Sequence, residues 1–292
     1  MTVDAQTWLR AGVAVVVAAA AVAVYRLSGR ARPPAREGMR WLEHLDDLRR
    51  RLFVSVAAVL LVSAFVFSFR WPPGSWHPVP ALHDNLAAQA FARLAADLVP
   101  PDVQLVQVRP LDGFMAELAV AFGIAAVVTL PVTLGQLGGF VAPALEARER
   151  RVLRTAIVPM VLLFAAGVAF AYVFVLPFLF STLYGYGIAL GAQPLLQVSE
   201  LVSFTVSLML VFGLAFQTPV AMYALTRVGL VPAEAWTRVW RHATVAIVIL
   251  AALVTDPTVV SQVMVAVPLL LLYGVGILAA RVAERRVSRA AG

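Results

Sequence analysis

Long stretches of this chain carry no charged residue, and no other feature restricts its fold as strongly. They are residues 52–69, 118–145, 155–199, 201–226 and 257–280. A helix needs roughly 17–25 apolar residues to cross a bilayer, and each stretch is that long or nearly so. Backbone amides in hydrocarbon must be paired within their own segment, so these runs predict helices rather than the short alternating strands of a barrel. With 61% apolar and 13% charged residues, the chain is also too apolar for a soluble domain. We therefore predict an all-α, polytopic transmembrane protein.

Six membrane spans form the predicted core. Their approximate positions are 52–69, 114–136, 155–180, 201–224, 242–256 and 260–280. The fifth is unusually short, because its apolar part would make only about 20 Å of helix against a hydrocarbon thickness of roughly 30 Å. A span this short must thin the bilayer locally or lie behind other helices.

A seventh apolar run, residues 11–25, precedes this core and is predicted to be one extra N-terminal span. A cleaved signal peptide fits less well, because the arginines directly after the run would resist translocation. In the alternative interpretation, translation starts at Met39. The predicted domains are an apolar segment with an Arg-rich linker (1–38), a six-helix membrane domain (39–286) and a short cytoplasmic tail (287–292).

The distribution of arginine predicts the orientation of the chain. All 23 basic residues are Arg, and 19 of them lie in the segments 26–51, 148–154, 227–241 and 281–289. By the positive-inside rule these segments face the cytoplasm. The chain is thus predicted to be a multi-pass protein of the cytoplasmic (inner) membrane with a cytoplasmic C-terminus. Because the arginines lie beside apolar spans, the high pI of 10.7 does not point to nucleic acid.

The long outer loop, residues 70–110, holds one predicted helix. Between residues 81 and 98, leucines and an alanine recur on one stripe while charged residues lie elsewhere. Such a pattern is typical of a helix lying on a membrane surface. Glu117, a few residues inside the second span, is expected near the same outer interface.

Five motifs resemble the TatC family, the polytopic receptor of the twin-arginine protein translocase. WLEHLDDLRRRL (41–52) resembles the family's amino-terminal signature, with Asp47 in the place of the usual Glu. RPLDGF (109–114) resembles the start of the family's second span, and FVAPALEARERR (140–151) resembles its first cytoplasmic loop. FGLAFQTPV (212–220) resembles the fourth span, and LVTDPTVVSQ (253–262) resembles the tight outer turn before the last span. The motifs follow the family order over nearly the whole chain.

The resemblance implies a receptor that binds twin-arginine signal peptides at the cytoplasmic face. With small single-span partner subunits of the TatA/TatB type, it would export folded proteins using the protonmotive force. The family's signal-contacting acids fall on Asp47 and Glu149. A carboxylate can accept a guanidinium bidentately, which suits recognition of arginine over lysine. Alternatively these acids only neutralise nearby arginines, since Asp47 and Arg51 have the spacing of an ordinary helical ion pair.

Other site residues are implied by the resemblance alone. Phe140, Arg49 and Arg151 would line the signal-peptide site, although Phe140 could equally be an interfacial aromatic and the arginines could contact lipid phosphate. Gln217 and Thr255 would face partner helices.

Gln262 would face the same partner helices as Gln217 and Thr255. Gln217 stands where many relatives carry Glu, so a titrating carboxylate is absent at this position. Alternatively, the Gln217 side chain forms its hydrogen bonds between the chain's own helices. Thr255 could instead bond its own backbone.

Other classes of function fit less well. A secondary transporter of a small solute is the main alternative, but such sites typically use charged residues and interrupted helices near the membrane centre, and no charge lies near a span centre here. Cysteines are absent, and no nucleotide-binding loop or nucleophile motif is present. We therefore expect no enzymatic activity, no cofactor and no metal. Membrane lipid and further copies of the chain are the remaining expected partners.

Overall fold

The computed structural model describes residues 41–72, 78–81, 83–142, 147–255 and 258–291. The whole predicted segment 1–38, with the apolar run at 11–25, its predicted extra span and the Arg-rich linker, lies outside the described residues. The described chain forms two compact units. The first comprises residues up to 97 with 105–146 and 197–203, and the second comprises 98–104, 147–196 and the chain from 204 onward.

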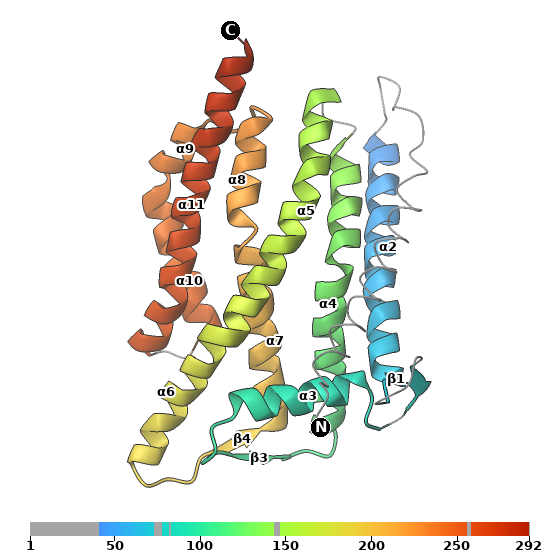
Figure 1. Cartoon of the computed structure of the whole chain (residues 1–292), viewed down its shortest axis with the longest axis vertical. Coiled ribbons are helices and arrows are strands. Elements are labelled where there is room, and N and C mark those ends of the chain that lie inside the picture. Colours follow the sequence, from blue (N-terminus) through green and yellow to red (C-terminus); the bar gives the residue numbers. More distant parts are fainter. Residues whose placement is uncertain (1–40, 73–77, 82, 143–146, 256–257, 292) are drawn as a thin grey trace, which may run out of the picture. The chain divides into compact units, whose positions relative to one another are not determined.

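In the first unit two long helices, α2 (Trp41–Ser68) and α4 (Asp112–Val141), pack side by side (Figure 1). The segment between them contains a short hairpin of β1 (Phe69–Arg70) and β2 (Val79–Pro80), followed by helix α3 (Leu86–Leu98). The rings of Phe67 and Phe114 meet edge to face at 5.5 Å near this end of the pair.

The second unit is built from the remaining helices. A long helical rod consists of α5 (Ala147–Phe170), the π-helical segment η2 (Ala171–Val175) and α6 (Leu176–Ala189). The others, in chain order, are α7 (Val198–Ala215, whose first residues belong to the first unit), α8 (Thr218–Arg227), α9 (Ala233–Arg238), α10 (Trp240–Val254) and α11 (Val259–Ala291). Helices α8 and α11 pack side by side (Figure 1). Two further short strands are β3 (Gln104–Val106) and β4 (Leu195–Gln197).

The all-α, polytopic prediction is confirmed. Among the described residues, the helical segments long and apolar enough to cross a membrane are His44–Ser68, Asp112–Val141, Thr155–Ala189, Val198–Arg227 and Val259–Arg285. They correspond to the first, second, third, fourth and sixth predicted core spans. The fifth prediction matches α10, a shorter apolar helix of 15 residues, so the expectation of an unusually short helix there is confirmed.

Prolines account for both irregularities in the long helices. Pro177 has no N–H and its ring crowds the carbonyl four residues earlier, in Val173. That carbonyl lies inside η2, where the wider π-helical turn accommodates the ring. The break between α7 and α8, at residues 216–217, likewise comes shortly before a proline, because Pro219 is the second residue of α8.

The helix predicted between residues 81 and 98 is confirmed from residue 86 onward, but its predicted start at residue 81 is wrong, and its position on a membrane surface stays a prediction. Asp84 has a left-handed backbone conformation (φ 58°), which a helix cannot contain. Asn85 then caps α3, because its Oδ1 accepts a hydrogen bond from the Ala88 N–H at 2.8 Å. The fully buried Asn85 also donates from Nδ2 to Glu117 Oε2 at 3.0 Å, which ties α3 to α4.

Replacing Asn85 with Ala is expected to destabilise the first unit. The lost cap is worth about 1 kcal/mol, and Glu117 also loses its donor. The melting temperature of the purified chain in detergent should therefore fall. Gln89→Ala, which removes only an exposed bond to the Asp84 carbonyl, is the matched control and should melt near the wild-type temperature. If Asn85→Ala and wild type melted at the same temperature, the hydrogen bonds of Asn85 with Ala88 and Glu117 would contribute nothing to stability.

Candidate functional site

The predicted signal-peptide residue Asp47 lies on the second turn of α2 and is half-buried. Its Oδ2 accepts a hydrogen bond and ion pair from Arg51 Nε at 2.7 Å. This is the helical pair weighed above as the alternative interpretation, and it does form. Among the described residues, however, no hydrogen bond reaches Oδ1, so half of the carboxylate's accepting capacity is open.

The C-terminal end of α4 supplies the other wall of this site. The ring of His44 stacks on Phe140, with centroids 4.3 Å apart and planes 20° from parallel. Two turns further along α2, Arg51 Nη1 donates to the Gln136 carbonyl at 3.4 Å. The structure thus brings the predicted site residues Asp47 and Phe140 onto one end of the first unit.

Close approach at Gly139 makes this arrangement possible. A Cβ placed on Gly139 would collide with Arg51 Nη1 and lie 3.0 Å from its Cζ. The Arg51 guanidinium therefore lies directly on the Gly139 backbone, near the C-terminal end of α4, where a cation is favoured by the helix dipole.

Sequence analysis did not select His44, Arg51, Gln136 or Gly139 for the site. The one available signal was local: His44, Asp47 and Arg51 recur at spacings of three and four residues, which places them on one face of a helix.

The remaining predicted signal-peptide residues are Arg49, Glu149 and Arg151. Arg49 is exposed and makes no hydrogen bond or ion pair with the described residues. Glu149 and Arg151 belong to the first turns of α5, but their side chains lie outside the described part of the structure. That Asp47 and Glu149 contact the same ligand therefore stays a prediction.

Gln217 lies at the break between α7 and α8. Its Nε2 donates to the Met160 carbonyl on α5 at 3.1 Å and to the Gly213 carbonyl at 3.2 Å. Its Oε1 is buried without a hydrogen-bond partner among the described residues. Both amide protons are thus used within the second unit, and a hydrogen bond to a partner helix, which stays a prediction, would use Oε1.

The two remaining predicted partner contacts also bond within the chain. Thr255 Oγ1 donates to the Ala251 carbonyl at 2.8 Å, as in the alternative considered for it. Gln262 Nε2 donates to the Val248 carbonyl at 3.3 Å and so links α11 to α10. Neither bond decides whether these residues also face another subunit.

The motif RPLDGF (109–114) has a structural explanation. Asp112, the first residue of α4, is almost fully buried, and its Oδ2 accepts hydrogen bonds from the Arg109 N–H at 2.8 Å and from Gln197 Nε2 at 2.7 Å. The carboxylate closes the turn before α4 and fixes the segment that leads into α7.

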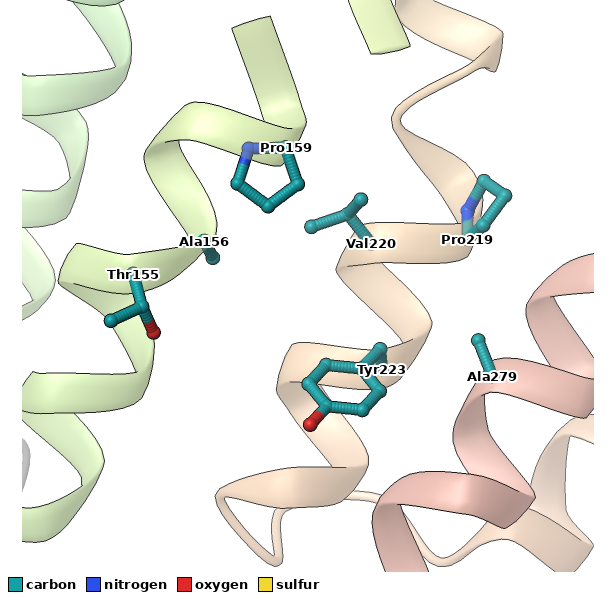
Figure 2. A pocket seen from close by; sticks show the side chains of 7 residues that line it. All are labelled: Thr155, Ala156, Pro159, Pro219, Val220, Tyr223 and Ala279. Carbon is teal, nitrogen blue, oxygen red and sulfur yellow. The ribbon is translucent and has the colours of Figure 1, made fainter. Parts of the chain in front are cut away.

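A separate pocket of about 270 Å³ lies within the second unit. Figure 2 shows its lining side chains, from α5 (Thr155, Ala156, Pro159), α8 (Pro219, Val220, Tyr223) and α11 (Ala279). The lining is apolar except for two hydroxyl-bearing side chains, and it contains no carboxylate, imidazole or cation. In the part of the chain that the structure describes, no three His, Asp or Glu residues gather in a way that could hold a metal.

Comparisons with known proteins place the chain in a family. The model of the family "Sec-independent protein translocase protein (TatC)" matches residues 43–268. The TatC protein of Cenarchaeum symbiosum is 37% identical over 255 residues, which cover 85% of this chain and 97% of that protein. The TatC protein of Aquifex aeolicus is 31% identical over 247 residues, which cover 84% of this chain and 95% of that protein.

Solved structures agree with the sequence relatives. A crystal structure described as the twin arginine translocase receptor TatC matches with a TM-score of 0.70 at 31% identity, over 82% of this chain and 99% of that one. A second TatC crystal structure, in the detergent DDM, matches with a TM-score of 0.69 at 30% identity. These matches support a multi-pass membrane component of a protein translocase rather than an enzyme. The family model and the relatives together show that this chain belongs to the TatC family of Sec-independent protein translocase proteins.

Proposed function

We propose that this chain binds twin-arginine signal peptides at the cytoplasmic membrane surface through the carboxylates of Asp47 and Glu149. The observation that most supports the proposal is the half-buried Asp47, whose carboxylate is held through Oδ2 while Oδ1 has no partner among the described residues. The ion pair alone is also what the surface-charge alternative predicts, but here Arg51 makes a second contact, with the Gln136 carbonyl of α4. Phe140, Arg49 and Arg151 complete the proposed binding residues.

The chemistry of the site favours arginine over lysine. A guanidinium is planar and presents several N–H donors in fixed directions, whereas an ammonium is a compact and strongly hydrated charge. An oriented carboxylate can match the first more closely than the second. The stack of His44 on Phe140 lies one turn before Asp47 on the same side of α2, so an aromatic surface lies beside the proposed binding position.

The wider activity is export of folded proteins, driven by the protonmotive force, together with small single-span subunits of the TatA/TatB type. Gln217, Thr255 and Gln262 are the proposed contacts with the helices of those subunits, and self-association would build a larger complex. The arginine distribution supports a cytoplasmic C-terminus and a six-helix membrane domain over residues 39–286, preceded by the extra apolar segment 1–38. The family assignment leaves the secondary-transporter alternative without support.

Photo-crosslinking from position 140 tests the signal-peptide proposal. A photoreactive phenylalanine analogue at Phe140 keeps an aromatic ring in place and leaves both carboxylates intact. We expect a crosslink to a twin-arginine signal peptide, a much weaker one to a twin-lysine peptide, and loss of the crosslink when Asp47→Ala is added. The same analogue at Phe53, an exposed residue of α2, is the control. Equal crosslinking from positions 140 and 53, or with both peptides, would contradict the proposal.

A further inference from the structure

We infer that Arg51 is a positioning residue for the proposed signal-peptide site, and that Gly139 is needed to seat its guanidinium. The inference rests on the proposed function, because it explains how Asp47 would be oriented for a ligand. Arg51 would hold one oxygen of the Asp47 carboxylate so that the other is presented to the signal peptide.

The contacts of Arg51 come from two helices. Nε donates to Asp47 Oδ2 on its own helix at 2.7 Å, and Nη1 donates to the Gln136 carbonyl of α4 at 3.4 Å. The guanidinium therefore links a side chain of α2 to the backbone of α4. An isolated i,i+4 pair on a solvated helix would have no such second anchor.

The link fixes which oxygen of Asp47 is available. A carboxylate has two oxygens and about four lone-pair sites. Arg51 approaches Oδ2 through Nε alone, so Oδ1 remains able to accept from a second guanidinium. Without Arg51 the Asp47 side chain would have to be ordered each time a peptide binds, and this ordering weakens binding.

The positive charge of Arg51 acts in the opposite direction, because it repels an arginine of the peptide. The two effects can be separated on this chain. Arg50 is an exposed neighbour that makes no hydrogen bond or ion pair with the described residues. Arg50→Met therefore removes one positive charge near the site without disturbing Asp47, and it is the matched control for Arg51→Met.

Gly139 provides a second, independent way to disturb the link. A Cβ at this position would collide with Arg51 Nη1, and its three nearest neighbours outside the adjoining helix backbone all belong to the Arg51 guanidinium. The colliding group is the end of a flexible side chain, so Gly139→Ala should displace the guanidinium and leave the helix pair folded. The variant changes no charge.

The test measures the affinity of the purified full chain in detergent for a fluorescent twin-arginine signal peptide and for its twin-lysine counterpart. We expect Arg51→Met to weaken twin-arginine binding by about three- to tenfold and to reduce the preference over twin-lysine. Gly139→Ala should act in the same direction. The double variant should bind no more weakly than Arg51→Met, because both changes remove one link.

Arg51→Lys should recover little of the twin-arginine affinity that is lost in Arg51→Met, since one ammonium cannot replace a guanidinium that contacts both Asp47 and Gln136. Arg50→Met should leave the preference unchanged. Melting temperatures of all variants separate a local effect from unfolding.

Two outcomes would overturn the inference, and they can be told apart. If Arg51→Met and Gly139→Ala bind like Arg50→Met while Asp47→Ala loses binding, the proposed function stands and the positioning role is wrong. If Asp47→Ala also binds like wild type, the proposed site itself is wrong, and the positioning role falls with it.

Discussion

Asp47→Ala and Glu149→Ala are each expected to reduce export of a folded twin-arginine cargo by roughly ten- to a hundredfold. Hydrogen bonds to charged groups are worth about 1.5–3 kcal/mol, and every 1.4 kcal/mol corresponds to about a tenfold change in affinity. Asp47→Glu should be mild or even improve export, because it restores the residue that the family usually carries there. Export is measured as the exported fraction of a folded reporter, alongside the amount of inserted chain.

Asp46 offers a matched control for the first of these variants. It is an exposed carboxylate next to Asp47 and makes no hydrogen bond or ion pair with the described residues. Asp46→Ala removes the same charge and should export normally. If both Asp47→Ala and Glu149→Ala insert and export like wild type, the two acids only balance surface charge.

The second large effect is expected from Gly167→Ala in α5. A Cβ there would lie 2.6 Å from the Phe212 carbonyl oxygen and 3.0 Å from the Gly213 Cα, both backbone atoms of α7. In turn, a Cβ on Gly213 would lie 2.7 Å from the ring of Phe164. Small residues let these two helices approach closely, as is common between helices in membranes. Because backbone cannot give way as a side chain can, we expect a destabilisation of about 1–3 kcal/mol or more.

Gly274→Ala is the control for this prediction. Gly274 lies inside the apolar part of α11, and a Cβ there would meet nothing within 4 Å. The change should be neutral or stabilise the helix by up to about 1 kcal/mol. The measurement is the melting temperature in detergent together with the amount of chain in membranes. Equal melting of the two alanine variants would mean that α5 and α7 do not depend on this close contact.

Much of the fold could be predicted because hydrocarbon leaves the backbone few choices. An apolar run must pair its own amides, so its length and position specify a helix directly. The short α10 was predictable for the same reason. The start of α3 was not, because it depends on the left-handed turn at Asp84 and the cap at Asn85, which the apolar stripe does not reveal. The π-helical turn η2 was not predicted either, because the apolar run carries no sign of it.

In the candidate site, too, local contacts could be predicted and contacts between distant residues could not. The pair of Asp47 and Arg51 is local, and helical spacing alone predicted it. The stack of His44 on Phe140 and the seat of Arg51 on Gly139 join residues that are far apart in the sequence, and a single sequence gives no measure of such pairings. Gln217 shows a further limit, because its chemistry indicated a hydrogen bond between helices but not that the acceptor would be the chain's own Met160 carbonyl.

The central claim is that this chain itself distinguishes two arginines from two lysines. The most direct measurement is an equilibrium titration of the purified chain with a twin-arginine signal peptide and with the same peptide carrying two lysines, at one fixed salt concentration because exposed charges are screened by salt. The account predicts that the twin-arginine peptide binds about tenfold tighter or more, and that a variant with both Asp47→Ala and Glu149→Ala loses this preference. Equal affinity for the two peptides, or a preference that survives in the double variant, would contradict it.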